Sequence, residues 1–169
     1  EAIDFGYTEA LTDTLGNHYG TKLGSLLTKA SDKLNEKMKQ RNRLHALKKK
    51  YQVTNPKKAN RLLKYNLGRQ KLVSTMNRTK ASLACEVNKG INDLVATKGF
   101  SVLVTEDLRH QFTYDGPKAV NRRLSFWIRG TLQDRIVFKA LAKGFRHEQV
   151  NPAYGSQTCP SCDFVDKKN

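Results

Sequence analysis

Residues 100–107 read FSVLVTED and contain the strongest strand signal in this 169-residue chain. The run from Val102 to Thr105 is short, apolar and rich in β-branched residues, which is typical of a central strand. It ends in Glu106 and Asp107, so two carboxylates directly follow the apolar run. The stretch predicts a buried strand with acidic side chains at its end.

Further strands are expected on both sides of this segment. Residues 2–6 (AIDFG) and 8–14 predict two short strands, and residues 18–20 predict the start of a third. After a polar loop over 109–118, a helix is expected over 119–143, and a last strand over 145–150. The helical period predicts inward-facing side chains at Leu124, Trp127, Ile128, Leu132, Ile136, Ala140 and Leu141.

The middle of the chain has a helical period. From Lys22 onward apolar residues recur at helical spacing, and basic residues fill the other face. Asn55 and Pro56 interrupt the pattern as an N-cap and a first-turn proline, and the pattern then continues to Gly99. We therefore expect two long helices that form an antiparallel hairpin. Strands, helices and strands in this order predict an α/β domain with a helical insertion.

The charge is concentrated in the helical segment. The chain has 31 basic and 15 acidic residues and a formal net charge of +16, which indicates a polyanionic partner. Residues 22–80 hold eighteen of the basic residues but only Asp32 and Glu36 as acids, so they account for the whole excess.

Basic helix faces are usually solvated surfaces, but intrahelical pairing with acids cannot explain this one. We therefore predict that the segment binds nucleic-acid phosphates. The candidate residues are Lys37, Lys39, Arg41, Arg43, Lys48, Lys49, Lys50, Lys57, Lys58, Arg61, Lys64, Arg69 and Lys71.

The cysteines point to zinc more than to disulfides. Cys159 and Cys162 form a CxxC pair, which is half of a four-ligand tetrahedral site. His147 could assist, although a lone histidine in a strand more often has no such role. Cys85 lies in a helical pattern and is expected to be a buried small apolar residue. The cysteine pattern does not indicate a secreted disulfide framework, so we expect a bacterial-type cytoplasmic, nucleoid-associated location. No apolar run is long enough to cross a membrane.

Asp4 and Glu106 are the candidate chemical residues. Two carboxylates on neighbouring strands can hold Mg²⁺ or Mn²⁺ together with water and phosphate oxygens. That role requires adjacent strands and carboxyl groups that converge at one end of the sheet. In the alternative interpretation, Glu106 and Asp107 cap a following turn, and Asp4 is a solvated acid near a strand end. Spacing alone leaves both interpretations open.

Several of these stretches occur in the same order in a known family. The chain resembles the TnpB/OrfB proteins of insertion sequences and their relatives, the type V CRISPR effectors. The resemblance covers essentially the whole chain, and residues 151–169 are its most specific part. The matching stretches are residues 3–6 (IDFG), the basic helices, 104–108 (VTEDL), 121–127 (NRRLSFW) and 151–162 (NPAYGSQTCPSC).

The resemblance implies an RNase H-like (RuvC) fold whose site uses three acids with Mg²⁺. Asp4 and Glu106 match the first two acids, and the third would follow a zinc ribbon that Cys159 and Cys162 begin. The implied parts are a first RuvC part (1–21), a basic helical insertion (22–98), a second RuvC part (99–150) and an incomplete zinc ribbon (151–169).

The implied function is that of an RNA-guided, Mg²⁺-dependent DNA endonuclease with guide RNA and target DNA as partners. The complete protein would also bind Zn²⁺. We expect this chain to be an inactive piece of it, since the third acid and the domains that normally precede the first strand are missing.

Two other functions remain open. A non-catalytic basic RNA- or DNA-binding module would explain the charge and the cysteines, but it leaves Asp4 and Glu106 unexplained. A strand-transfer transposase domain would use the same acids and differ in its product.

Overall fold

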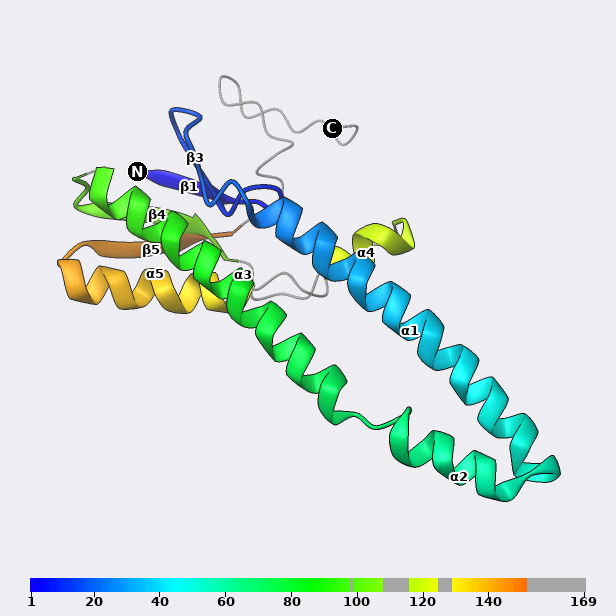
Figure 1. The fold of residues 1–169 in the computed structure, drawn as a ribbon. Helices are drawn as coiled ribbons and strands as arrows, with labels where there is room; N and C mark the ends of the chain where they lie inside the picture. The colour runs from blue at the N-terminus through cyan, green and yellow to red at the C-terminus, as the bar shows by residue number, and fades with distance from the viewer. Residues whose placement is uncertain (98, 108–115, 125–128, 152–169) are drawn as a thin grey trace.

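The computed structural model describes residues 1–97, 99–107, 116–124 and 129–151 (Figure 1). Three short strands come first: β1 (Ala2–Phe5), β2 (Leu11–Asp13) and β3 (His18–Tyr19). Three helices follow: α1 (Leu23–Thr54), α2 (Pro56–Tyr65) and α3 (Gln70–Thr97). The last elements are β4 (Val102–Glu106), α4 (Lys118–Leu124), α5 (Arg129–Lys143) and β5 (Arg146–Val150). No helix in the described ranges has the length and apolar character that crossing a bilayer requires.

The strands form one mixed sheet of five strands in the order β3-β2-β1-β4-β5. β1 pairs antiparallel with β2, and β2 pairs antiparallel with β3. β4 is parallel to both of its neighbours, β1 and β5. The predicted α/β class with a mixed sheet is therefore confirmed, and the architecture is compatible with an RNase H-like fold. β4 lies inside the sheet, as its apolar sequence predicts.

One face of the sheet carries the hydrophobic core. Strand side chains alternate between the two faces, and the alternate residues Ile3, Phe5, Leu11 and Leu103 are buried. The helices α1, α3 and α5 supply the opposing side chains. Those buried side chains are Leu23, Leu27, Leu83, Val87, Ile91, Leu94, Leu132, Ile136 and Ala140.

A close backbone contact holds α3 against the end of β3. A Cβ atom built on Gly90 of α3 would lie 2.9 Å from the backbone nitrogen of Gly20. Gly20 itself has φ of +65°, and a Cβ there would lie 2.7 Å from the Cβ of Ala10. The amide of Leu23, the first residue of α1, donates to the Gly20 carbonyl at 3.1 Å. The start of α1 and the middle of α3 therefore meet at one glycine turn.

The helices between β3 and β4 form the predicted antiparallel hairpin (Figure 1). At about 1.5 Å per residue, the 32 residues of α1 extend about 48 Å. Asn55 caps α2 as predicted, because its side chain accepts a hydrogen bond from the amide of Lys58 at 3.1 Å. The chain then returns through α2 and α3, which both contact α1.

A second break separates α2 from α3, where the sequence predicted one continuous helix. The amides of Asn66 and Leu67 both donate to the Leu62 carbonyl, at 3.0 and 3.1 Å, which ends α2. The guanidinium of Arg41 on α1 donates to the carbonyls of Leu67 and Gly68, each at 2.9 Å. A distant arginine thus satisfies the backbone groups that the break leaves free.

Other predictions need correction. Cys85 is exposed rather than buried, because it lies two residues, about 200°, after buried Leu83 on α3. Leu141 is 82% exposed, since it follows buried Ala140 by about 100° of helical turn. The predicted helix over 119–143 is represented by α4 and α5. Trp127, Ile128 and most of the predicted loop lie outside the described residues.

We predict that Gly90→Ala lowers the free energy of unfolding by up to about 2 kcal/mol. The added methyl group meets backbone atoms, and overpacking of this kind costs about 1–3 kcal/mol, more than the roughly 1 kcal/mol that alanine gains over glycine in a helix. Denaturant unfolding measures the change. The control is Gly130→Ala on α5, where an added Cβ has no atom within 4 Å. Equal stability changes in the two variants would contradict the tight contact.

Candidate functional site

Asp4 and Glu106 lie beside each other near the ends of two parallel strands. The strand register pairs Ala2 with Val104 and Ile3 with Thr105, so the next step along both strands brings Asp4 to Glu106. Both point away from the core, because their neighbours Ile3, Phe5 and Thr105 are buried on the other face. Asp4 is exposed and Glu106 is half-buried. The acid-bearing strands are adjacent, as the metal-site hypothesis requires.

The two carboxylates influence each other electrostatically. Burial raises the pKa of Glu106 above its ordinary value of 4.5, and the negative charge of Asp4 raises it further. Like charges that face each other favour the protonated form of one partner. The pair is therefore a place where a cation would be stabilised.

The chain continues its sheet pairing beyond Glu106. The amide of Asp107 donates to the carbonyl of Val150 on β5 at 2.8 Å. Residues 108–115, where a capped turn would continue, lie outside the described residues. The capped turn at Glu106 and Asp107 therefore stays a prediction.

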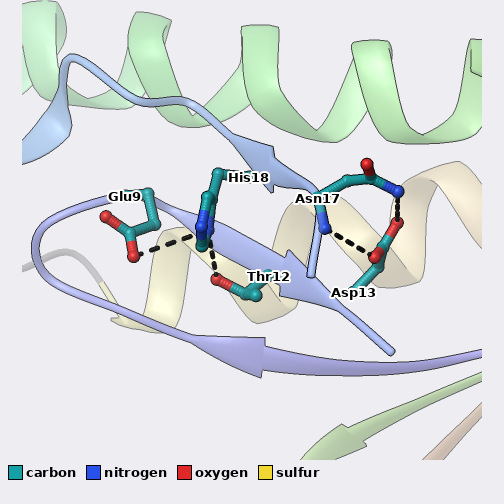
Figure 2. Close-up of polar contacts among 5 residues, drawn as sticks. All are labelled: Glu9, Thr12, Asp13, Asn17 and His18. Carbon is teal, nitrogen blue, oxygen red and sulfur yellow. Dashed lines mark hydrogen bonds and ion pairs between the residues drawn. The ribbon is translucent and has the colours of Figure 1, made fainter. Parts of the chain in front are cut away.

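The acid pair belongs to a longer row of polar side chains on the same face. Asp4 is paired with Thr12 on β2, and Thr12 is paired with His18 on β3. Nδ1 of His18 lies 3.1 Å from Oγ1 of Thr12 and 3.6 Å from Oε1 of Glu9 (Figure 2). The row Glu106–Asp4–Thr12–His18 therefore crosses four strands.

A buried carboxylate holds the turn that positions this row. Asp13, which is 5% exposed, accepts hydrogen bonds from the backbone and side-chain amides of Asn17, each at 2.9 Å (Figure 2). It accepts another from the backbone amide of Leu15, also at 2.9 Å. It also accepts a hydrogen bond from the hydroxyl of Tyr19 at 3.1 Å. These contacts fix the β2–β3 turn and with it the place of His18.

The donor atoms of Asp4 and Glu106 suit a hard cation. Magnesium takes oxygen ligands and is usually held by one or two carboxylates, with water and substrate phosphates filling the other positions. Among the residues that the structure describes, no group of three or more His, Cys, Asp or Glu side chains is arranged for a metal. The two carboxylates of Asp4 and Glu106 would leave the other ligand positions of such an ion to water or phosphate.

The predicted zinc ligands Cys159 and Cys162 lie outside the described residues. Nε2 of His147 is 2.8 Å from Oγ1 of Thr105, and burial lowers the pKa of this histidine. Cys85 is exposed on α3, whereas His147 lies on β5. The zinc half-site therefore stays a prediction.

Most of the predicted basic residues are available to a ligand. Of the thirteen, all except Lys37, Arg41 and Lys48 are exposed, and these three are half-buried. Nζ of Lys37 bonds Oγ1 of Thr75 at 3.1 Å, and Arg41 holds the turn before α3. Within the described ranges no lysine or arginine of residues 22–80 forms an ion pair. The hairpin therefore presents a surface of uncompensated positive charge.

The comparisons with known proteins find one partial similarity that can be reported. The chain is 33% identical to a TnpB-like protein of Aquifex aeolicus over 102 residues, which are 58% of this chain and 32% of that protein. The chain is therefore similar to a TnpB-like protein over more than half of its own length. The chain spans about a third of the length of this TnpB-like relative. No protein-family model matches the chain.

We predict that Asp4→Asn lowers the pKa of Glu106 only part of the way to its ordinary value. The substitution removes the repulsion between charges, while burial, the larger cause of the raised pKa, remains. Carbon-13 NMR of the labelled glutamate carboxyl groups measures the titration. The matched control is Asp134→Asn on α5, which is exposed and distant in sequence.

The same shift affects stability. A carboxyl with a raised pKa in the folded state stabilises the protein fully below its ordinary pKa, and this contribution is lost as the pH rises through the folded-state pKa. The loss of unfolding free energy above pH 4.5 should therefore be smaller in Asp4→Asn than in the parent chain. An unchanged Glu106 titration would show that the two carboxylates do not face each other.

Proposed function

We propose that this chain is the nuclease core of an RNA-guided, Mg²⁺-dependent DNA endonuclease of the TnpB type. The main observation is the juxtaposition of Asp4 and Glu106 on the sheet face opposite the helical core. The basic hairpin beside the same sheet, with guide RNA and target DNA as its partners, is the second support. The protein would act in the cytoplasm, at the nucleoid.

Asp4 and Glu106 would hold the metal ions through their carboxylate oxygens. Bound divalent ions at such a site supply an activated water and charge stabilisation for cleavage of a phosphodiester. The protein's own contribution is to hold two carboxylates on stiff neighbouring strands, so that the site is formed before substrate arrives. The resemblance puts a third acid after the zinc ribbon that Cys159 and Cys162 begin.

The basic hairpin would bind the nucleic-acid backbone. Its lysines and arginines lack acidic partners in the described ranges, so contact with phosphates would relieve their mutual repulsion. In RNA-guided recognition, base pairing selects the sequence, and the protein contacts mainly the backbone. The proposed division of labour is therefore binding by residues 22–80 and cleavage at Asp4 and Glu106.

The metal-binding part of the proposal is tested with Mn²⁺ as the probe. Water-proton relaxation measures its affinity for the parent chain and for Asp4→Asn and Glu106→Gln. Loss of groups that only support a ligand already weakens metal binding about 10–100-fold, so loss of either carboxylate should weaken it by at least about tenfold.

The control for this measurement is Asp134→Asn, which removes an exposed carboxylate from α5. It should leave the affinity for Mn²⁺ unchanged. If all four proteins bind Mn²⁺ equally, Asp4 and Glu106 do not form the site, and a non-catalytic nucleic-acid-binding module becomes the better proposal.

The nucleic-acid part is tested by charge removal in the hairpin. Changing six of its basic residues to glutamine should weaken duplex binding for all sequences alike, because phosphate contacts carry no base information. Each lost contact should reduce the slope of log affinity against log salt by about 0.9. The six residues are Lys48, Lys49, Lys50, Lys57, Lys58 and Arg61.

A second sixfold variant controls for net charge. It replaces six basic residues outside 22–80 with glutamine and should change the slope much less. The six residues are Lys89, Lys118, Arg135, Lys139, Lys143 and Arg146. Circular dichroism checks that both variants fold. If the two variants lose equal affinity, binding depends on total charge and the hairpin is only a solvated surface.

A further inference from the structure

The connection between α2 and α3 is bordered by two grooves. We call residues 65–69 the elbow. One groove has a volume of about 680 Å³ and is lined by Lys57, Lys58, Arg61 and the elbow residues Tyr65 and Asn66, among others. The other, of about 560 Å³, is lined by the same Tyr65 and Asn66 together with residues of α1 and the start of α3. Both volumes are in the range typical of small-ligand sites.

Tyr65 and Asn66 line both grooves. Tyr65 is 71% exposed, although it is a large aromatic residue. Nζ of Lys64 lies 5.3 Å from the centroid of its ring. Because Lys64 lies over one face of the ring, a stacking partner would use the opposite face, close to a positive charge.

The polar residues that line the grooves, apart from Tyr65, are cations and amides, and Leu44, Leu62, Gly68 and Leu72 complete the linings. Lys37, Lys64 and Lys71 line the second groove together with Gln40 and Gln70. Asn66 lines both grooves. No carboxylate is present among the described residues that line either groove. The combination provides a stacking surface, amides that can both donate and accept hydrogen bonds, and charges that attract an anion.

The elbow is held in place before any ligand binds. The two hydrogen bonds from Arg41 fix the carbonyls of Leu67 and Gly68. The side chain of Leu67 is 5% exposed and anchors the turn. Ala59 of α2 is also buried, and α2 contacts α1. A rigid platform loses little entropy on binding.

From these features we propose that the elbow binds one unpaired nucleotide of a single-stranded nucleic acid. Its base would stack on Tyr65, its phosphates would contact the neighbouring lysines, and the amides of Gln40, Asn66 and Gln70 would bond the edge of the base. The inference rests on the nucleic-acid role in the proposed function but adds a site that recognises bases. It therefore differs from the phosphate contacts expected along the rest of the hairpin.

An unpaired base fits better than a duplex or an acidic peptide. Within a duplex the faces of the bases are covered by their neighbours, whereas splayed-out bases of single strands stack on aromatic side chains. An acidic peptide would use the lysines but would leave an exposed ring and three amides without a function.

The test measures binding of fluorescein-labelled oligo(U) and oligo(dT) to the full chain and to Tyr65→Ala and Tyr65→Phe. Loss of one stacking contact should reduce affinity roughly 5- to 150-fold. The slope of log affinity against log salt should not change, because no phosphate contact is lost. Tyr65→Phe should bind like the parent chain, since the ring is retained. Leu63→Ala, which removes an exposed apolar side chain outside both grooves, is the control.

A crosslinking experiment locates the contact and identifies the strand. Oligonucleotides with 5-iodouracil, as RNA and as DNA, are irradiated with the parent chain, and mass spectrometry finds the modified residue. A crosslink at Tyr65 supports the inference, and the more efficient oligonucleotide shows whether RNA or DNA is the source. A crosslink only at other residues overturns it.

The outcomes separate this inference from the proposed function. If Tyr65→Ala binds single strands as tightly as the parent while the sixfold hairpin variant loses salt-dependent affinity, the elbow site is wrong and the hairpin proposal stands. If poly-glutamate displaces oligo(U) from the parent and from Tyr65→Ala equally well, the elbow is a general anion site and the inference fails. If the parent chain binds no nucleic acid, both fail.

Discussion

The contact between Gly90 and Gly20 determines how the rest of the molecule is arranged. At this point the backbone of α3 approaches the turn after β3 so closely that no side chain fits between them. The same turn begins α1, and the amide of Lys22 also bonds Oε1 of Glu86 on α3 at 3.2 Å. The two long helices are therefore positioned against the sheet by a few backbone atoms. Their buried leucines then complete the core beneath.

Because the helices and the hydrophobic core cover one face of the sheet, the polar side chains of the candidate site lie on the opposite face. Side-chain alternation sends Ile3 and Thr105 into the core and sends Asp4 and Glu106 outward. The cost of this arrangement is visible in the raised pKa of Glu106. Folding alone gives no reason to keep two carboxylates together there, and such local conflicts are typical of functional sites.

Much of this arrangement can be read from local sequence. The apolar run of β4 and the Asn55–Pro56 break are local signals, and both appear where the sequence predicts them. The break before α3 was missed because it depends on Arg41, more than twenty residues away in the sequence. The row from Asp4 through Thr12 to His18 was also missed, since a register between strands is decided by tertiary packing and turn geometry. The exposure of Cys85, in contrast, follows from its helical phase relative to Leu83.

The long helix α3 gives the molecule a mechanical property. Its inner half is fixed to the sheet, and its outer end supports the elbow, so it acts as a rigid lever with its fulcrum at Gly90 (Figure 1). The elbow lies about 30 Å from this fulcrum at about 1.5 Å per residue, so a tilt of about 5° would displace it by about 3 Å. That displacement is close to the rise between successive residues of a nucleic-acid strand. A small tilt of α3 at the sheet would therefore be enlarged at the far end of the hairpin.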